Sequence, residues 1–246
     1  MTEIDGPVLA VIPCRRGSKR LPGKNTRLLG GRPMVDYTLE PALVDEAIDE
    51  VLVTSDDPAV IARAAALGCS VDYERPAELS EDGTTSYDTV IHALDWYRDR
   101  VGRDPAILIL LQVTSPLRPA DIPAQALGML AAAPSVDGVV GMRRIGVSSD
   151  NVFVAPGENE TRLQRLQGDR PDRLALLVPN GAVYALRVPA FRREKTFMPA
   201  HTLPLIMKPS ASLDIDTFDD FTLAEAALAH RPNESASPAS PIKTDR

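Results

Sequence analysis

One loop of the sequence gathers most of the residue types that bind phosphate. No acidic residue occurs between Gly6 and Val35, a stretch that carries seven basic residues: Arg15, Arg16, Lys19, Arg20, Lys24, Arg27 and Arg32. The chain of 246 residues has a formal net charge of −7, so a generally basic composition does not explain this cluster. Arginine supplies planar donors and lysine mobile point charges, and both suit phosphate oxygens. We favour an anion site over the alternative of a solvated basic loop, because such loops usually intersperse acids.

The centre of this cluster is the segment 13–25, here called the phosphate loop. It is not a P-loop, because five residues instead of four separate Gly17 from Gly23 and Asn25 follows the lysine. A dinucleotide fingerprint is also excluded, since Gly-x-Gly-x-x-Gly occurs nowhere. We expect the backbone N–H groups of Gly17 and Ser18 to form a concave turn for phosphate oxygens. The charge for a triphosphate would then come from Arg15, Arg16, Lys19 and Lys24.

Two carboxylates near the other end of the chain are candidates for a metal. Asp214 and Asp216 are two residues apart, so both point the same way on an extended segment. Mg²⁺ takes one or two acidic ligands together with phosphate oxygens and waters. The alternative is that Asp216 and Thr217 only cap the helix that follows. We favour metal binding for both aspartates, and we expect Asp219 and Asp220 to stabilise the first turn of that helix.

The elements that must position these residues alternate between strand and helix. Short apolar runs predict strands at 8–12, 50–54, 70–73, 106–111, 135–142 and 182–188. Helical patterns occur at about 33–44, 57–67, 86–100, 121–132 and 218–230. Such alternation predicts an α/β fold, a three-layer αβα arrangement with a mostly parallel, Rossmann-like sheet whose central strand is 106–111. Ligands bind beyond the carboxyl ends of such strands, where the phosphate loop and the loop 112–118 lie.

The predicted domain covers residues 1–230 and contains one interruption. The stretch 143–178 is polar and breaks the alternation, which indicates a small inserted arm that acts as a lid or a dimerisation element. The tail 231–246 is rich in Pro, Ser and Lys, a composition typical of disorder. No internal repeat is present.

Composition sets limits on the function. Hydrophobic residues make up 44% of the chain and charged residues 25%, which is typical of a globular protein. The negative net charge argues against affinity for nucleic acid or anionic membrane. No apolar run approaches the roughly 20 residues that cross a bilayer, and the acidic N-terminus is unlike a signal peptide. Because Cys14 and Cys69 have no metal-ligand spacing, we expect a cytoplasmic protein with free thiols.

Six segments, taken in order, resemble one family. They are Ile12 to Asn25, Val53-Thr-Ser-Asp56, Arg75-Pro-Ala-Glu-Leu79, Leu110 to Arg118, Pro179-Asn-Gly-Ala-Val-Tyr184 and Asp214-Ile-Asp216. Over residues 8 to 229 the chain resembles the CMP-sialic acid synthetases, also called acylneuraminate cytidylyltransferases. Val113 departs from the family pattern, in which proline is usual at this position. Cys14 replaces the usual small residue of the nucleotide signature.

The resemblance implies a nucleotidyltransferase fold and the transfer of CMP from CTP to a hydroxyl of an acidic acceptor, a nonulosonic (sialic-type) acid, with release of pyrophosphate and with Mg²⁺ as cofactor. It also implies a homodimer in which 143–178 is the exchanged arm. The implied catalytic residues are Lys19, Lys24, Asp214 and Asp216, with both aspartates on the metal. The resemblance and the basic loop, taken together, indicate a set of nucleotide-binding residues. It comprises Arg15, Arg16, Gly17, Ser18, Lys19, Lys24, Asn25, Arg75, Glu78, Thr84, Ser86, Gln112, Thr114 and Ser115. The acceptor-binding set is Gln112, Arg118, Arg170, Arg173, Asn180 and Gly181.

One departure concerns the acceptor. The family typically places an arginine just before the Pro-Asn-Gly segment, where this chain has Leu176-Leu-Val178. Arg170 and Arg173, or else Arg143 and Arg144, are candidates to replace it. Alternatives therefore stay open: a different acid such as a small phosphonate, or a nucleotide-binding module without catalysis. The intact set of Lys19, Lys24, Gln112, Asp214 and Asp216 argues against the latter.

Other titratable residues receive minor roles. We expect His92 to pack on its helix, His201 to be a possible acceptor contact, and His230 to lie at a helix end, where a cation is favourable. Asp216, or a metal-bound water, is the candidate general base. Cys14 is expected to be a buried packing residue, although the neighbouring arginines could lower its pKa.

Overall fold

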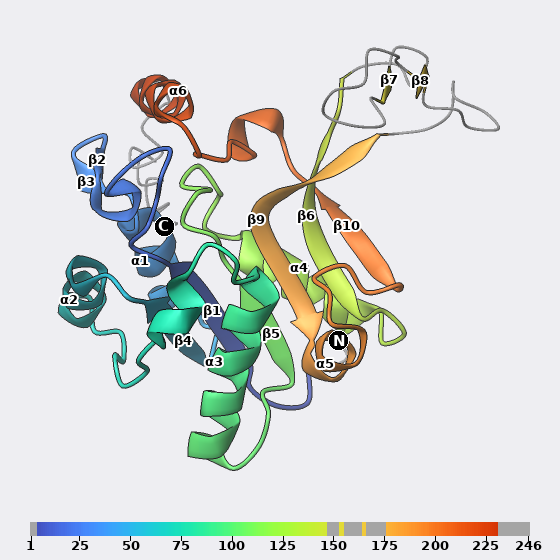
Figure 1. Cartoon of the computed structure of the whole chain (residues 1–246). Helices are drawn as coiled ribbons and strands as arrows, with labels where there is room; N and C mark the ends of the chain where they lie inside the picture. The colour runs from blue at the N-terminus through green and yellow to red at the C-terminus, as the bar shows by residue number, and fades with distance from the viewer. Residues whose placement is uncertain (1–3, 147–152, 155–163, 166–175, 231–246) are drawn as a thin grey trace, which may run out of the picture.

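The computed structural model describes residues 4–146, 153–154, 164–165 and 176–230. Its centre is a six-stranded sheet with the order β10-β6-β9-β5-β1-β4 (Figure 1). Only β9 runs antiparallel to its neighbours, so the prediction of a mostly parallel sheet is confirmed. The strands are β1 Val8–Cys14, β4 Glu50–Ser55, β5 Ile107–Leu110, β6 Gly138–Arg144, β9 Leu177–Arg187 and β10 Thr202–Ile206.

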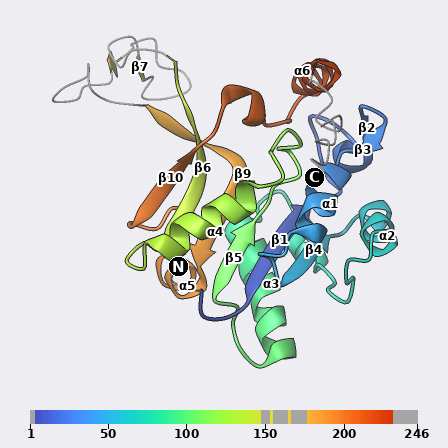
Figure 2. The same cartoon turned by 180° about the vertical axis from the view of Figure 1, so that it is seen from behind.

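Helices cover both faces of this sheet, which confirms the three-layer αβα arrangement. Figure 1 shows α3 in front of the sheet, and Figure 2, from behind, shows α4 on the opposite face. The helices are α1 Asp36–Val44, α2 Pro58–Ala66, α3 Ser86–Val101, α4 Ile122–Ala132, α5 Val188–Glu194 and α6 Phe218–Ala229. Short elements complete the chain: η1 Lys24–Thr26, β2 Leu28–Leu29, β3 Arg32–Pro33, η2 Ala77–Ser80 and η5 Pro209–Ala211.

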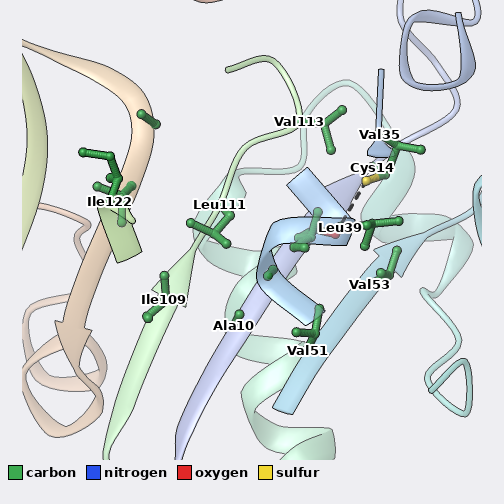
Figure 3. Close-up of a cluster of buried hydrophobic side chains, with 14 of the residues drawn as sticks. Ala10, Cys14, Val35, Leu39, Val51, Val53, Ile109, Leu111, Val113 and Ile122 are labelled. Carbon is green, nitrogen blue, oxygen red and sulfur yellow. Dashed lines mark hydrogen bonds between the residues drawn. The ribbon is translucent and has the colours of Figure 1, made fainter. Parts of the chain in front are cut away.

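Alternating strand residues divide the core into two clusters. On β1, Val8, Ala10 and Ile12 join the cluster packed under α1, α2 and α4, and Leu9 and Val11 join the cluster under α3 and α5. Figure 3 shows the first cluster, with side chains of β1, β4 and β5 against Leu39 of α1. Because both faces are buried, these strands read as continuous apolar runs in the sequence.

The helices α2 and α3 each begin after a residue that caps the first turn. Asp57 accepts the Ala59 N–H at 3.0 Å before α2, as predicted. Thr85 and Asp88 form a capping box at the start of α3. These caps satisfy backbone donors that the first helical turn leaves free. They also fix the loops that enter both helices at the carboxyl edge of the sheet.

Some expected boundaries were wrong. Residues 70–73 form no strand, because Tyr73 is held by side-chain packing against the rings of His92 and Trp96 and not by strand pairing. The first helix begins at Asp36 and not near residue 33, because Pro33 pairs with Leu28 in a two-stranded ribbon. The strand β10 and the short helix α5 were not predicted from the sequence.

Part of the predicted arm is described. The ends of β6 and β9 pair as far as Arg144 and Leu177, and they run away from the three layers in Figure 1. Within the arm, β7 Phe153–Val154 pairs with β8 Gln164–Arg165. The rest of 143–178 and the tail 231–246 lie outside the described residues. No helix in the described part of the chain is long and apolar enough to cross a membrane.

Candidate active site

A cavity of about 560 Å³ lies at the carboxyl ends of β1 and β5. Its walls come from the phosphate loop, the loop that leads into α3, the loop after β5, and the residues before α6. Eleven predicted residues line it: Arg15, Ser18, Lys19, Lys24, Asn25, Arg75, Thr84, Ser86, Gln112, Thr114 and Asp216. The fold thus brings motifs from distant parts of the sequence to one cavity, at the edge that the alternation predicted.

The phosphate loop is held by polar contacts on both sides of its turn. The Asn25 amide donates to the Arg15 carbonyl at 3.0 Å, and the Arg16 N–H donates to Asp56 at 2.7 Å. Gly23, with φ of 66°, adopts the left-handed conformation that lets the chain enter η1. Asn25 is therefore buried as a structural tie within the loop, even though part of it reaches the cavity.

The expected cradle of backbone N–H groups does not form in this structure. The Ser18 N–H donates to the Arg16 carbonyl at 2.9 Å, and the Arg16 N–H is taken by Asp56. Arg16 and Gly17 do not line the cavity. The loop therefore reaches the cavity mainly through its charged residues, together with Ser18.

Lys24 is the most buried cation of the cavity. Its side chain is 10% exposed, and its ammonium donates to the Ile215 carbonyl at 2.8 Å and to Asp216 Oδ1 at 3.2 Å. A buried charge needs both a counter-ion and further hydrogen bonds, and Lys24 has both. The contact joins the phosphate loop to the segment before α6, which lies 192 residues further along the chain.

Three charged residues of the cavity, Arg20, Glu81 and Asp82, were absent from the predicted site. Arg20 pairs with Asp216 Oδ2 at 2.7 Å, and Asp82 pairs with both Lys19 and Arg15. The hydrogen bond from Lys19 holds the pKa of the Asp82 carboxyl below its usual range. Arg20 carried a signal, since it lies within the basic cluster. Asp82 carried none, because its partners are more than sixty residues away in the sequence.

Arg75 lies in the wall between the phosphate loop and α3. Its guanidinium donates to the Leu79 carbonyl and, at 3.3 Å, to Thr89 Oγ1. Burial lowers its pKa, and no carboxylate of the described residues forms an ion pair with it. Thr84 donates to the Glu78 carbonyl at 2.8 Å, and Glu78 itself does not line the cavity. Arg75 is therefore an oriented cation that faces the cavity without a counter-ion among these residues.

The loop after β5 forms the opposite wall, through Gln112 and Thr114. Gly181 has φ of 74°, and a Cβ there would lie 2.3 Å from Gln112 Oε1, so only glycine lets the Gln112 amide occupy this position. The predicted residues Ser115, Arg118 and Asn180 lie behind this wall and do not line the cavity. The Arg118 guanidinium donates to the Ala182 carbonyl at 2.8 Å, and burial lowers its pKa to about 10.

The two metal candidates differ in position. Asp216 lines the cavity, whereas Asp214 does not line it, and the Asp214 carboxyl is partly removed from water although the residue as a whole is exposed. Burial raises the pKa of Asp214, a hydrogen bond from Thr114 opposes this, and the nearby charge of Asp216 raises it further. Thr217, not Asp216, caps α6, and Asp220 completes the capping box, which confirms its expected role. The described residues contain no cluster of three or more acids, histidines or cysteines.

The histidines and Cys14 do not line the cavity. His92 Nδ1 contacts the Tyr73 hydroxyl at 2.9 Å, and His230 lies at the end of α6, as expected. His201 was a minor candidate for an acceptor contact, and it lies at the amino edge of the sheet, where its carbonyl accepts the Asp137 N–H at 2.8 Å. Burial raises the pKa of the Cys14 thiol more than the charge of Arg75 lowers it, so the suggestion of a lowered pKa was wrong.

Comparisons with known proteins point to one family. A family model described as cytidylyltransferase matches residues 9–220. The N-acylneuraminate cytidylyltransferase of Streptococcus agalactiae is 32% identical over 219 residues, which cover 87% of this chain and 51% of the relative. The chain thus spans about half the length of that protein. The CMP-N,N'-diacetyllegionaminic acid synthase of Legionella pneumophila is 32% identical over 235 residues, which cover 90% of this chain and 96% of the relative.

A solved structure supports the fold. The CMP:2-keto-3-deoxy-manno-octonic acid synthetase complexed with CTP superposes with a TM-score of 0.66 at 20% identity, over 91% of this chain and 98% of that one. The family model and the two relatives confirm the resemblance carried by the six motifs along most of the chain. The chain belongs to the cytidylyltransferase family, together with the CMP-sialic acid synthetases.

Proposed function

We propose that this protein transfers CMP from CTP to a hydroxyl of a sialic-type sugar acid and releases pyrophosphate. One observation carries the proposal: five cations from two separate loops surround one cavity at the carboxyl edge, opposite Gln112. They are Arg15, Lys19, Arg20, Lys24 and Arg75. A triphosphate is the ligand whose charge matches so many cations. The similar proteins are named for sugar acids, so a small phosphonate acceptor is not favoured.

In this mechanism the acceptor oxygen attacks the α-phosphorus of CTP. A new P–O bond forms while the bond from the α-phosphorus to the bridging oxygen breaks, and pyrophosphate leaves with that oxygen. The acceptor hydroxyl loses its proton, and Asp216 is the candidate base. Catalysis of this kind depends mainly on positioning and on charge stabilisation. Lys19 and Lys24 would stabilise charge on the phosphate oxygens, and Lys24 is fixed for this by the Ile215 carbonyl.

The residues present fit Mg²⁺. The Asp216 carboxylate is ion-paired with Lys24 and Arg20, lines the cavity, and lies near enough to Asp214 to shift the pKa of that group. Two carboxylates satisfy the protein share of a magnesium site that completes its shell with phosphate oxygens and water. When bound, the ion would neutralise phosphate charge. Asp214 and Asp216 are the residues that we propose to hold it.

The acceptor carboxylate needs a cation. Strand pairing sets Arg143 opposite Val178 and Arg144 opposite Leu177, in the segment where the family resemblance implies an arginine. Both arginines are exposed, whereas Arg170 and Arg173 lie outside the described residues. Because neighbours on a strand point to opposite faces, we propose that one of Arg143 and Arg144 binds the acceptor. Single alanine variants should separate them, since one would raise the acceptor KM about tenfold and the other would not.

Pyrophosphate release tests the proposal directly. The protein is incubated with CTP, Mg²⁺ and a panel of N-acylneuraminate, legionaminic, pseudaminic and 3-deoxy-octulosonic acids, and the product masses are recorded. We expect a CMP-linked sugar acid that appears with wild type and not with Asp214→Ala. Absence of CTP binding would contradict the proposal at its base. Turnover with CTP only on an acceptor that is not a sugar acid would keep the cytidylyl transfer and reject the acceptor class.

The homodimer belongs to the same proposal. Its support is the pair of strand ends, β6 and β9, that extend beyond the three layers. Light scattering on the purified chain should give about twice the mass of 26.6 kDa. A monomeric mass would remove the exchanged arm from the proposal and leave the cavity unaffected.

A further inference from the structure

The carboxylate of Asp82 is ion-paired with two of the cations that the proposed function assigns to phosphate binding. It forms ion pairs with Lys19 and, at 3.4 Å, with Arg15, and all three residues line the same cavity. Phosphate and carboxylate oxygens make the same kind of charge-assisted hydrogen bond with these donors. In this structure Asp82 thus makes the contacts that a phosphate oxygen would make with the same two cations.

The loop that carries Asp82 is anchored independently of these ion pairs. The Thr84 N–H donates to the Glu81 carbonyl at 3.1 Å, and the Thr84 hydroxyl donates to the Glu78 carbonyl at 2.8 Å. On the other side, Thr85 begins α3 with a capping box. Asp82 is therefore held between two anchored segments, so the cations can change partner while the carboxylate stays beside the cavity.

The exposure of these side chains makes such an exchange inexpensive. The side chains of Asp82 and Lys19 are 59% and 75% exposed, and an ion pair at such exposure contributes little free energy. The Lys24–Asp216 pair differs, because its lysine is 10% exposed. The cavity therefore contains a buried cation contact at Lys24 and, at Asp82, exposed contacts that are more easily exchanged.

We propose that Asp82 is a built-in competitor of the phosphate chain, which pairs with Arg15 and Lys19 in the empty site and yields them when a polyphosphate binds. The inference rests on the proposed function and adds a determinant of ligand selection and product release. A ligand with several phosphate charges displaces the carboxylate, whereas one phosphate competes poorly with it. When pyrophosphate leaves, Asp82 regains its partners, so the carboxylate lowers the affinity of the site for this product.

The test is Asp82→Asn, with binding of CTP, CMP and inorganic pyrophosphate measured by calorimetry in Mg²⁺. We expect pyrophosphate and CTP to bind about three- to tenfold more tightly to the variant, and CMP to change less than twofold. Glu81→Gln is the matched control. Glu81 lines the same cavity and has no ion pair among the described residues, and the substitution removes the same charge. Its effect should be less than half as large. In a Lys19→Met background, Asp82→Asn should lose most of its effect.

The outcomes are separable. Equal or weaker pyrophosphate binding by Asp82→Asn would overturn the inference, as would an equal effect of Glu81→Gln, which would indicate only the general field of the cavity. Thermal unfolding of both variants should match wild type, so a folding defect would be detected. If wild type binds neither CTP nor pyrophosphate, the proposed function fails and the inference fails with it. If wild type binds both but turns over no acceptor, the binding measurements still decide the role of Asp82.

Discussion

The two edges of the central sheet both carry clustered charge, and they use it differently. The cavity at the carboxyl edge is lined by five cations and three carboxylates, which leaves a formal surplus of two positive charges. At the amino edge, a groove of about 410 Å³ is lined by three of each: Arg103, Arg187 and Arg193 with Asp5, Asp104 and Asp137. An excess of one sign favours a charged ligand, whereas a balanced set favours internal pairing.

The partners of the individual cations do not follow this difference, because exposed ion pairs, and arginines with no ion pair among the described residues, occur at both edges. At the amino edge, Arg187 donates to the Val136 and Leu130 carbonyls at 2.9 and 3.0 Å, and Arg193 pairs with Asp137. At the carboxyl edge, Arg75 has no ion pair among the described residues, and Lys19 is paired only in an exposed contact. The comparison teaches that arginine content alone does not mark a site. What marks it is the surplus of one sign of charge that the fold gathers around the cavity.

The largest effect should follow removal of the buried cation. Lys24→Met keeps the apolar stem but loses the ammonium, so we expect kcat/KM for CTP to fall by about two to three orders of magnitude, the usual loss for a fixed donor that stabilises transition-state charge. The matched variant at the opposite edge, Arg103→Met, should keep wild-type activity. Steady-state pyrophosphate release measures both. Similar losses in the two variants would mean that the edges are not functionally distinct.

A smaller effect tests the cavity wall that Gln112 forms. Gly181→Ala places a Cβ against the Gln112 amide at a backbone conformation that costs other residues roughly 1–2 kcal/mol. We expect kcat/KM to fall about ten- to a hundredfold and the unfolding midpoint to drop by several degrees. Gly128→Ala is the control, since no atom lies within 4 Å of the added carbon in α4. That variant should be as stable as wild type or slightly more stable. Full activity in Gly181→Ala would remove Gln112 from the proposed site.

How much of this contrast the sequence contains depends on the range of the interactions. The strands at 8–12 and 106–111 were predicted because both of their faces are buried and apolar. Asp57 was predicted as a helix cap because capping depends only on neighbouring residues in the sequence. Asp82 was missed because its partners come from another loop, and an ion pair across that distance leaves no local pattern. The strand predicted at 70–73 was wrong for a related reason, because a buried aromatic such as Tyr73 can be held by side-chain packing without strand pairing. Local rules thus predicted most of the elements and the basic loop, and only the fold decided which charges remain available.

The amino edge should affect stability and not activity. Arg192 joins α5 to two carboxylates, Asp95 at 2.8 Å and Asp104 at 2.6 Å, with its side chain 23% exposed. Arg192→Ala breaks both contacts, and we expect it to lower the free energy of unfolding by about 1–2 kcal/mol, between the values for exposed and buried pairs. Urea unfolding measures this change, and calorimetry with CTP should give an unchanged Kd. A weaker CTP affinity would contradict the separation of roles between the edges.

The smallest expected change concerns the thiols, one near each edge. Cys14 ends β1 beneath the phosphate loop, and Cys69 donates to the Val51 carbonyl near the start of β4 at 3.3 Å. Burial raises the pKa of both thiols, that of Cys69 to about 11, so at pH 8 about one Cys69 in a thousand is thiolate. We therefore expect iodoacetamide at pH 8 to label neither cysteine in the folded chain and both in urea, as read by intact mass. Labelling of Cys14 alone, suppressed by CTP, would show that the carboxyl edge opens in the empty protein. In that case the binding edge would differ from the amino edge in local stability as well as in available charge.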